Sequence, residues 1–369
     1  MKTPTITKID IYKLSIPLSR PYRTALGLFD HANNIIVRIH SSDGFYGIGE
    51  GCPDAYTTGE TQETDFEAAK LLGRLLVGKN PLAIEARVKE MNSRLVHNTT
   101  IKGAFDIALY DLLAKRADLP LYAFLGGEKR TLQTCMTVGL DSPEVMAQEA
   151  LEFVEKGIHS IKVKLGTNQA DDVARIQAIR KVVDKNVPLY IDGNQGWNPT
   201  TAIQTLHALA PFNIQFCEEP VAHWNNAGLK HVRDHSPIPV MADESISDHH
   251  DAFRLASMGA CDYFNIKLAK SGGIHTALKI DAIAQSAGIQ CMVGCMEETR
   301  LLLSATAHLV SARPNIIFVD LDAAFYLAED PIIGGITYEG GQIILPDTPG
   351  HGADIEPAYL DNLESVSIT

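Results

Sequence analysis

Charged residues end several short apolar runs in the middle of the chain. Lys162 and Lys164 lie in one run, and the next three runs end at Asp192, Glu218 and Asp243. Carboxylate oxygens are the ligands that Mg²⁺ prefers, with coordination positions left for water and substrate. One acid at a strand end more often caps a helix or stays solvated. Acids on three successive runs favour a metal site formed by Asp192, Glu218 and Asp243.

The lysines suggest proton transfer beside that metal. Lys162 and Lys164 are two residues apart, so in a strand their side chains point to the same face. A divalent cation lowers the pKa of a nearby lysine, which lets it act as a base near pH 7. Lys267 ends a later run, and two lysines facing each other across a carboxylate could carry out a 1,1-proton transfer. Solvated or carboxylate-paired lysines are the alternative, but buried strands rarely carry unpaired lysine.

The spacing of these residues predicts the fold that positions them. Lys164, Asp192, Glu218, Asp243 and Lys267 follow one another at intervals of about 25 residues, a length that suits one strand-helix unit of a (β/α)8 TIM-type barrel. Apolar positions recur at helical spacing between the first two of them. We expect barrel strands near 133–139, 159–165, 187–192, 213–218, 238–243, 262–268, 289–296 and 316–322. Their C-terminal ends open on one face, where the charged residues converge.

The first 125 residues have a different rhythm, which predicts an α+β capping domain. Thr5–Ile16 and Asn34–His40 alternate like antiparallel strands, and Asp43-Gly44 predicts a hairpin turn. Helices are expected near 62–78, 81–96 and 101–117. We expect loops at Ser19–Asp30 and Gly49–Thr61 to cover the barrel mouth.

Three segments follow from these patterns. Residues 1–125 form the capping domain, 126–325 the barrel, and 326–369 a segment that returns to the capping domain. The tail is rich in glycine and proline and resumes short alternating runs.

Composition excludes some classes of function. The net charge of −13 argues against nucleic-acid or anionic-membrane binding. The six cysteines lack a CxxC pair, which favours buried thiols in a reducing compartment. The first residues show no signal-peptide core and no long apolar run follows. A soluble cytoplasmic protein is expected.

The order of motifs resembles the enolase superfamily, in its muconate lactonizing enzyme subgroup. The motifs are Lys162-x-Lys164, Asp192-Gly-Asn, Glu218-Glu-Pro, Ala-Asp243-Glu-Ser, Asn-Ile-Lys267 and Ser-Gly-Gly at 271–273. The resemblance implies Mg²⁺ on the same three acids, Lys162 as a cation beside the substrate carboxylate, and Lys164 and Lys267 as the acid/base pair. In this superfamily a lysine or histidine base works with Mg²⁺ on an enediolate. The resemblance also suggests that the protein is a homo-oligomer.

Asp320 and Asp322, at the eighth strand, indicate the substrate. They lie on one face and could bind an ammonium group, although an acid pair can also cap a helix. The pair resembles the Asp-x-Asp motif with which dipeptide epimerases hold the substrate amine. Muconate and succinylbenzoate lack this amine. The resemblance therefore implies inversion of the C-terminal residue of an Ala-X dipeptide.

The side chain of X is the least constrained feature. Family members that act on Ala-Glu are expected to carry a basic residue where this chain has Gly27, so we expect a hydrophobic or uncharged residue. Glu298 matches a family position on the seventh strand, and Thr137 could bond the substrate carboxylate. Glu297 would suit a cationic side chain, which is the runner-up.

Two other functions remain open. A lyase or cycloisomerase of the same subgroup, such as a muconate cycloisomerase or an o-succinylbenzoate synthase, could use the same metal and lysines. A barrel that binds metal but has lost catalysis is the third interpretation. Deuterium exchange at the α-carbon of Ala-X dipeptides would distinguish the three.

Overall fold

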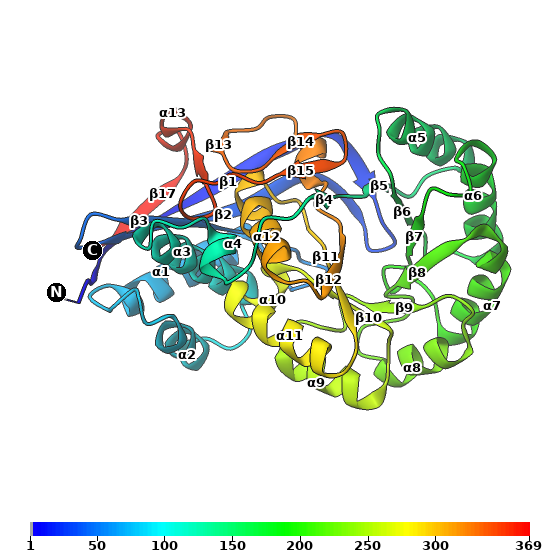
Figure 1. Cartoon of the computed structure of the whole chain (residues 1–369), viewed down its shortest axis with the longest axis horizontal. Coiled ribbons are helices and arrows are strands. Elements are labelled where there is room, and N and C mark those ends of the chain that lie inside the picture. Colours follow the sequence, from blue (N-terminus) through cyan, green and yellow to red (C-terminus); the bar gives the residue numbers. More distant parts are fainter. Residues whose placement is uncertain (1–2) are drawn as a thin grey trace.

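Eight short parallel strands form a curled sheet in the computed structural model, which describes residues 3–369 (Figure 1). Neighbours in the sheet follow chain order, and the Cys135 N–H donates to the Val319 carbonyl at 3.0 Å, which links its two edges. The strands are β5 (Met136–Val138), β6 (Ile161–Lys164), β7 (Leu189–Asp192), β8 (Ile214–Glu218), β9 (Val240–Ala242), β10 (Tyr263–Ile266), β11 (Gln290–Val293) and β12 (Ile316–Val319). All eight overlap the predicted ranges, and the barrel prediction is confirmed.

Helices on the outside connect these strands (Figure 1). They are α5 (Pro143–Glu155), α6 (Gln169–Val182), α7 (Pro199–Leu209), α8 (Asn226–His235), α9 (His249–Met258), α10 (Leu268–Ser271), α11 (Ile274–Ser286) and α12 (Arg300–Ala312). Side chains of Ser142, Asn168 and Asn198 cap the first three by accepting backbone N–H groups. After β12 the chain forms only the 3₁₀ helix η2 (Ala323–Tyr326), so the eighth unit lacks a full helix.

The inward faces of the strands carry an apolar floor below the charged residues. Cys135, Tyr190, Phe216, Met241 and Met292 form one buried cluster inside the barrel, and the Tyr190 and Phe216 rings stack 4.5 Å apart. Inward positions recur every second residue. Two residues after the floor positions Tyr190, Phe216 and Met241 come Asp192, Glu218 and Asp243. The floor therefore supports the acids at the C-terminal mouth.

An antiparallel sheet and helices form the capping domain. Its strands are β1 (Ile6–Arg23), β2 (Leu28–Ser41), β3 (Tyr46–Gly51) and β17 (Ser365–Ile368), in the order β17-β1-β2-β3. Its helices are α1 (Gln62–Leu76), α2 (Ile84–Arg94), α3 (Thr99–Arg116) and α4 (Leu121–Phe124). The hairpin predicted at Asp43-Gly44 joins β2 and β3, with φ of 90° at Gly44. The three predicted helices are confirmed.

The tail carries further short elements between the barrel and β17. They are β13 (Ile332–Gly334), β14 (Thr337–Glu339), β15 (Gln342–Ile344), β16 (Ala353–Ile355) and α13 (Pro357–Leu360), and β15 pairs with β4 (Leu132–Gln133). None of the helices from residue 3 to the C-terminus combines the length and apolar character that a membrane crossing requires.

The predicted loop at Ser19–Asp30 is wrong, because most of it is a hairpin. β1 continues to Arg23 and β2 begins at Leu28, so the two strands pair again beside the turn that joins them. The register shifts between Pro17 and Tyr22, where Pro21 has no N–H to donate. Pairing then resumes as Tyr22 opposite Phe29. The hairpin tip reaches the barrel, where the Leu140 N–H donates to the Arg23 carbonyl at 2.8 Å.

Candidate active site

Three buried acids and Lys162 meet at the barrel mouth. Adjacent strands bring Asp192 opposite Glu218 in the register, and Asp243 directly follows β9. All three acids are fully buried. The Lys162 Nζ lies 3.2 Å from Asp192 Oδ2 and 2.8 Å from Glu218 Oε2. Lys162 therefore joins two of the three predicted ligands, and Asp243 is paired with Lys267 and Lys270 instead.

Lys164 and Lys267 reach this cluster from opposite sides. Lys164 lies on β6 and Lys267 directly follows β10, and these strands are four places apart among eight. Lys164 Nζ lies 2.7 Å from Asp192 Oδ2, and Lys267 Nζ lies 2.8 Å from Asp243 Oδ2. Both lysines are buried. Such a pair can hold a proton on either side of a substrate atom placed between them.

The site's carboxylates hold Lys162 and Lys267 protonated. Burial by itself lowers the pKa of Lys162, but Asp320, Glu218 and Asp192 together raise it well above its usual range. The pKa of Lys267 is likewise lowered by burial, but Asp243, Glu218 and Glu244 together raise it well above its usual range. The sequence argument expected a divalent cation to lower these pKa values, and the protein's own carboxylates act in the opposite direction.

The same contacts set the pKa values of the acids. Burial raises the pKa of Asp192, but Lys164 and Lys162 lower it below its usual value. Burial likewise raises the pKa of Asp243, but Lys267 and Lys270, with smaller contributions from other groups, lower it well below its usual value. Burial and Asp192 instead raise the pKa of Glu218 well above its usual range. The cluster is therefore held together by alternating charge, with Glu218 as its most readily protonated member.

The oxygens fit a hard divalent cation. Glu218 Oε2 and Asp243 Oδ2 accept no hydrogen bond of good geometry, although each lies at ion-pair distance from a lysine. Buried carboxylate oxygens with free lone pairs are costly unless a cation satisfies them. Carboxylates from three neighbouring strands form the donor set that Mg²⁺ prefers. The residues present therefore fit the predicted metal.

Neighbouring acids hold the loops that carry these ligands. Glu219 accepts the Asp243 N–H at 2.7 Å, and Glu244 accepts the Asn194 amide at 3.3 Å. Glu219 and Asn194 have positive φ values of 31° and 39°. Loops in this strained region persist where surrounding contacts hold them. These acids orient the site from outside it.

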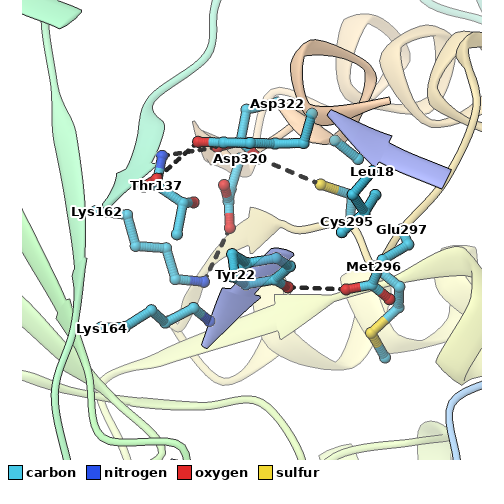
Figure 2. Close-up of a pocket in the computed structure, with 12 residues that line it drawn as sticks. Leu18, Tyr22, Thr137, Lys162, Lys164, Cys295, Met296, Glu297, Asp320 and Asp322 are labelled. Carbon is cyan, nitrogen blue, oxygen red and sulfur yellow. Dashed lines mark hydrogen bonds and ion pairs between the residues drawn. The ribbon is translucent and has the colours of Figure 1, made fainter. Parts of the chain in front are cut away.

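A cavity opens beside the cluster, and Figure 2 shows its lining. Lys162 and Lys164 point into it from β6, with Asp320 and Asp322 on the facing wall. Asp320 Oδ2 accepts from Lys162 Nζ at 2.9 Å. Asp322 Oδ2 accepts the Thr137 N–H at 2.7 Å, so Thr137 holds an acid through its backbone. The sequence did not reveal that Asp320 is paired with a lysine.

The two acids differ in protonation. Burial raises the pKa of Asp320, but Lys162 outweighs it and the net pKa lies below the usual value. Burial and Asp320 raise the pKa of Asp322 to about 6. Both groups are therefore mainly ionised at neutral pH, and they give this wall of the cavity a negative charge.

Two predicted substrate contacts lie away from this cavity. Glu298 is buried but does not line it, and burial and Glu50 raise its pKa well above the usual value. A Cβ on Gly27 would lie 3.0 Å from the Tyr56 ring, so Gly27 packs against that side chain. Glu297 lines the cavity instead and accepts from the Tyr22 hydroxyl at 2.8 Å (Figure 2).

Sequence reasoning missed three residues near the site. Tyr22 comes from the hairpin that was predicted as a loop, and Tyr326 lies on η2, where no motif marks it. Lys270 is buried and contacts Asp243. The sequence could have identified Lys270, because a lysine three residues after Lys267 lies in an otherwise apolar buried stretch.

Comparison with known proteins agrees with this geometry. Residues 7–126 match Mandelate racemase / muconate lactonizing enzyme, N-terminal domain, and residues 145–359 match Enolase C-terminal domain-like. The chain is 43% identical to D-Ala-D/L-Ala epimerase of Cytophaga hutchinsonii, with 98% of this chain and 99% of the relative covered. It is 41% identical to hydrophobic dipeptide epimerase of Enterococcus faecalis, with 92% and 96% covered.

A solved structure extends the similarity to three dimensions. The crystal structure of a dipeptide epimerase from Cytophaga hutchinsonii, complexed with Mg and the dipeptide D-Ala-L-Val, is 42% identical and superposes with a TM-score of 0.98. The match covers 99% of this chain and all of the other. The chain therefore belongs to the mandelate racemase/muconate lactonizing enzyme family of the enolase superfamily.

Proposed function

We propose that this protein is a Mg²⁺-dependent dipeptide epimerase, which inverts the α-carbon of the second residue of Ala-X dipeptides. The observation that carries the proposal is the placement of Lys164 and Lys267 on opposite sides of one buried acid cluster. The relatives named above are dipeptide epimerases, and one was solved with Mg and a dipeptide, which supports the reaction class and the metal.

Asp192, Glu218 and Asp243 would hold the metal. When bound, Mg²⁺ supplies positive charge beside the substrate carboxylate, where negative charge develops as the α-proton leaves. Lys162 lies between Asp192 and Glu218 and lines the cavity. It binds the same carboxylate and orients the α-carbon toward the two remaining lysines.

Lys164 and Lys267 would exchange the proton. One lysine removes the α-proton from its side, and the other delivers a proton to the opposite side, which inverts the configuration. The next turnover in the reverse direction exchanges their roles. Lys164 contacts Asp192, and Lys267 contacts Asp243. A cation bound by these carboxylates would reduce their attraction for the lysine proton, and so would lower the pKa of each lysine.

Asp320 and Asp322 would bind the substrate amine. The pKa of Asp322 is about 6 and that of Asp320 lies below its usual value, so both are mainly ionised at pH 7. Asp322 is fixed by the Thr137 N–H and has an oxygen available toward the cavity. Two acids beside one ammonium group select substrates with a free amine over dicarboxylates.

An uncharged X is favoured by the hairpin side of the cavity. Tyr22 and Phe29 stack 5.4 Å apart, and Met296 lines the same cavity. Burial and Asp54 raise the pKa of Glu297 to about 7, so it can be neutral without a cationic partner. Glu298 and Gly27 are proposed as weaker contributors, through packing around this wall.

An Ala-X library in D₂O tests the proposal. Deuterium at the X α-carbon together with inversion, lost with EDTA and restored with Mg²⁺, is the expected result. Turnover of muconate or succinyl carboxylates without dipeptide inversion would favour the lyase alternative. Mg²⁺ binding without exchange would favour a non-catalytic barrel, and a preference for Ala-Lys or Ala-Arg would favour the cationic alternative.

We further propose the segments 1–125, 126–325 and 326–369 as capping domain, barrel and returning tail. Pairing of β17 with β1 supports the last of these. We also propose a homo-oligomer in the cytoplasm. The exposed Trp224 and Phe253 side chains and the six unpaired thiols support these two features, and light scattering after size exclusion tests the first.

A further inference from the structure

A second buried lysine contacts Asp243 from outside the cavity. Lys270 lies on α10 and is 1% exposed. Its Nζ lies 2.6 Å from Asp243 Oδ1, whereas Lys267 contacts the other oxygen, Oδ2. Lys270 is not among the residues that line the cavity. One carboxylate therefore lies between two ammonium groups, one on each of its oxygens.

All three protons of the Lys270 ammonium have acceptors. Besides Asp243 Oδ1, the Nζ donates to the Asp243 carbonyl and, at 3.3 Å, to the Asn265 carbonyl. An ammonium group has three donors and no acceptor, so none remains for a substrate. Asp243 follows β9, and Asn265 lies in β10. Lys270 thus links two strand ends and leaves proton transfer to other groups.

These contacts restrict the Asp243 carboxylate to one orientation. An aspartate can rotate about two side-chain bonds, and a metal ligand must have its oxygen in place. With Oδ1 and the main-chain carbonyl both held by Lys270, Oδ2 is the oxygen left to face the cluster. Oδ2 is also the Asp243 atom that accepts no hydrogen bond.

We propose that Lys270 is a positioning residue, which holds Asp243 so that Oδ2 is directed at the divalent cation. The inference rests on the proposed metal site. The positive charge of Lys270 and its orienting contacts predict opposite changes in Mg²⁺ affinity when Lys270 is removed. An ammonium beside a ligand carboxylate repels a cation, so removing it would tighten Mg²⁺ binding if charge dominated. Loss of orientation would weaken binding, and we expect this effect to dominate because Lys267 continues to neutralise Asp243.

The capping domain sets the position of α10. A Cβ on Gly103 of α3 would lie 3.1 Å from the Leu268 carbonyl and from the Gly273 N–H, so the backbones of α3 and α10 are in close contact. Asp106 of α3 accepts the His275 N–H at 3.1 Å, at the start of α11. The turn that carries Lys267 and Lys270 is therefore anchored at both ends by one helix.

Calorimetric titration with Mg²⁺ in the absence of substrate tests the proposal. Lys270→Met is expected to raise the Mg²⁺ Kd at least tenfold, the effect typical of losing a group that orients a metal ligand. Lys102→Met is the matched control, because Lys102 is also buried but lies in the capping domain. Its Kd is expected to equal that of the wild type. An unchanged or lower Kd for Lys270→Met would overturn the proposal.

Kinetics separate positioning from proton transfer. At saturating Mg²⁺ the kcat of Lys270→Met is expected to return to within threefold of the wild-type value, and a kcat that stays low would contradict a positioning role. If Lys270→Met does not fold, Lys270→Arg replaces it, with a Kd raised at least threefold because a planar guanidinium cannot match all three acceptors. An unchanged Kd there also overturns the inference. Wild-type protein that binds Mg²⁺ but inverts no dipeptide would refute the epimerase function alone.

Discussion

Buried carboxyl groups occur in both domains, and Asp65 of the capping domain differs in its partners from three acids at the barrel mouth. At the barrel mouth Asp192, Asp243 and Asp320 each contact a lysine, which lowers their pKa values against the effect of burial. In the capping domain burial and Glu60 raise the pKa of Asp65 to about 9, and neither Asp65 oxygen has a hydrogen-bond partner. Lysines thus keep these three aspartates ionised, whereas Asp65, which has no cation beside it, stays protonated.

The difference between the lysine-paired acids and the protonated Asp65 indicates where the reaction takes place. Maintaining several buried charges of both signs is costly, and removal of one partner leaves the other uncompensated. Structural acids such as Asp65 avoid that cost by staying neutral. The charged cluster of the barrel has no comparable structural purpose, which supports its assignment as the reactive centre. The following changes test the contrast, from the largest expected effect to the smallest.

Removal of a buried lysine should have opposite consequences in the two domains. Lys267→Ala is expected to lower kcat/KM for inversion at least 10³-fold, because general acid–base groups contribute about 10²–10⁴-fold and Asp243 also loses a partner. Lys102→Ala should lower the Tm and leave kcat within twofold. Steady-state polarimetry on Ala-X measures both. Full activity of Lys267→Ala would remove the two-lysine mechanism.

The paired acids of the cavity wall should affect substrate binding more than turnover. Replacement of both Asp320 and Asp322 by asparagine is expected to raise the KM for dipeptides about 10- to 100-fold, because the substrate amine loses two charged partners. A smaller change in kcat is expected. Identical KM values for the variant and the wild type would count against amine binding at this wall.

Glu297 connects the barrel and the capping domain, because it lines the barrel cavity and accepts a hydrogen bond from Tyr22 of the β1–β2 hairpin. Its pKa of about 7 predicts a change in selectivity with pH. Below pH 7 the neutral acid favours uncharged X, and above pH 7 the carboxylate favours cationic X by a few-fold. Competition between Ala-Val and Ala-Lys from pH 6 to 8 measures this shift. Glu297→Gln should remove it, and Glu63→Gln, an exposed acid of α1, should not.

Asp65 should affect stability alone. Between its unfolded pKa near 4 and its folded pKa of about 9, the folded protein holds a proton that the unfolded chain releases. Stability attributable to Asp65 therefore falls as pH rises through this window. From pH 6 to 8 the wild type should lose roughly 3 kcal/mol more than Asp65→Asn in urea unfolding, since each pH unit corresponds to about 1.4 kcal/mol. Parallel pH profiles would show that Asp65 is ionised.

Much of the barrel could be predicted because local pattern and tertiary structure agree there. Buried parallel strands are continuous apolar runs, and the acid at the end of each run marks the mouth. Lys164, Asp192, Glu218 and Asp243 were therefore placed correctly on one face. The hairpin of β1 and β2 could not be predicted, because Pro21 and Gly27 are residue types typical of loops. Its pairing depends on a register shift that only the folded sheet specifies.

Contacts between side chains on different barrel strands could not be predicted from the sequence either. Asp320 and Lys162 are 158 residues apart, and no periodicity indicates that they touch. The hydrogen bond from the Thr137 N–H to Asp322 could not be predicted for the same reason. Lys270 could have been noticed as a buried lysine, but its acceptors come from two other strands. Sequence spacing predicts which face a residue occupies and does not predict its partner.

Exchange at the α-carbon measures the central claim most directly. L- and D-configured X residues are incubated separately in D₂O with the wild type, Lys164→Ala and Lys267→Ala. Exchange into both isomers is expected for the wild type, and each variant should retain exchange with one isomer only, a different one for each variant. If both variants lose the same isomer, or either retains both, the lysines do not act from opposite sides of the carbon.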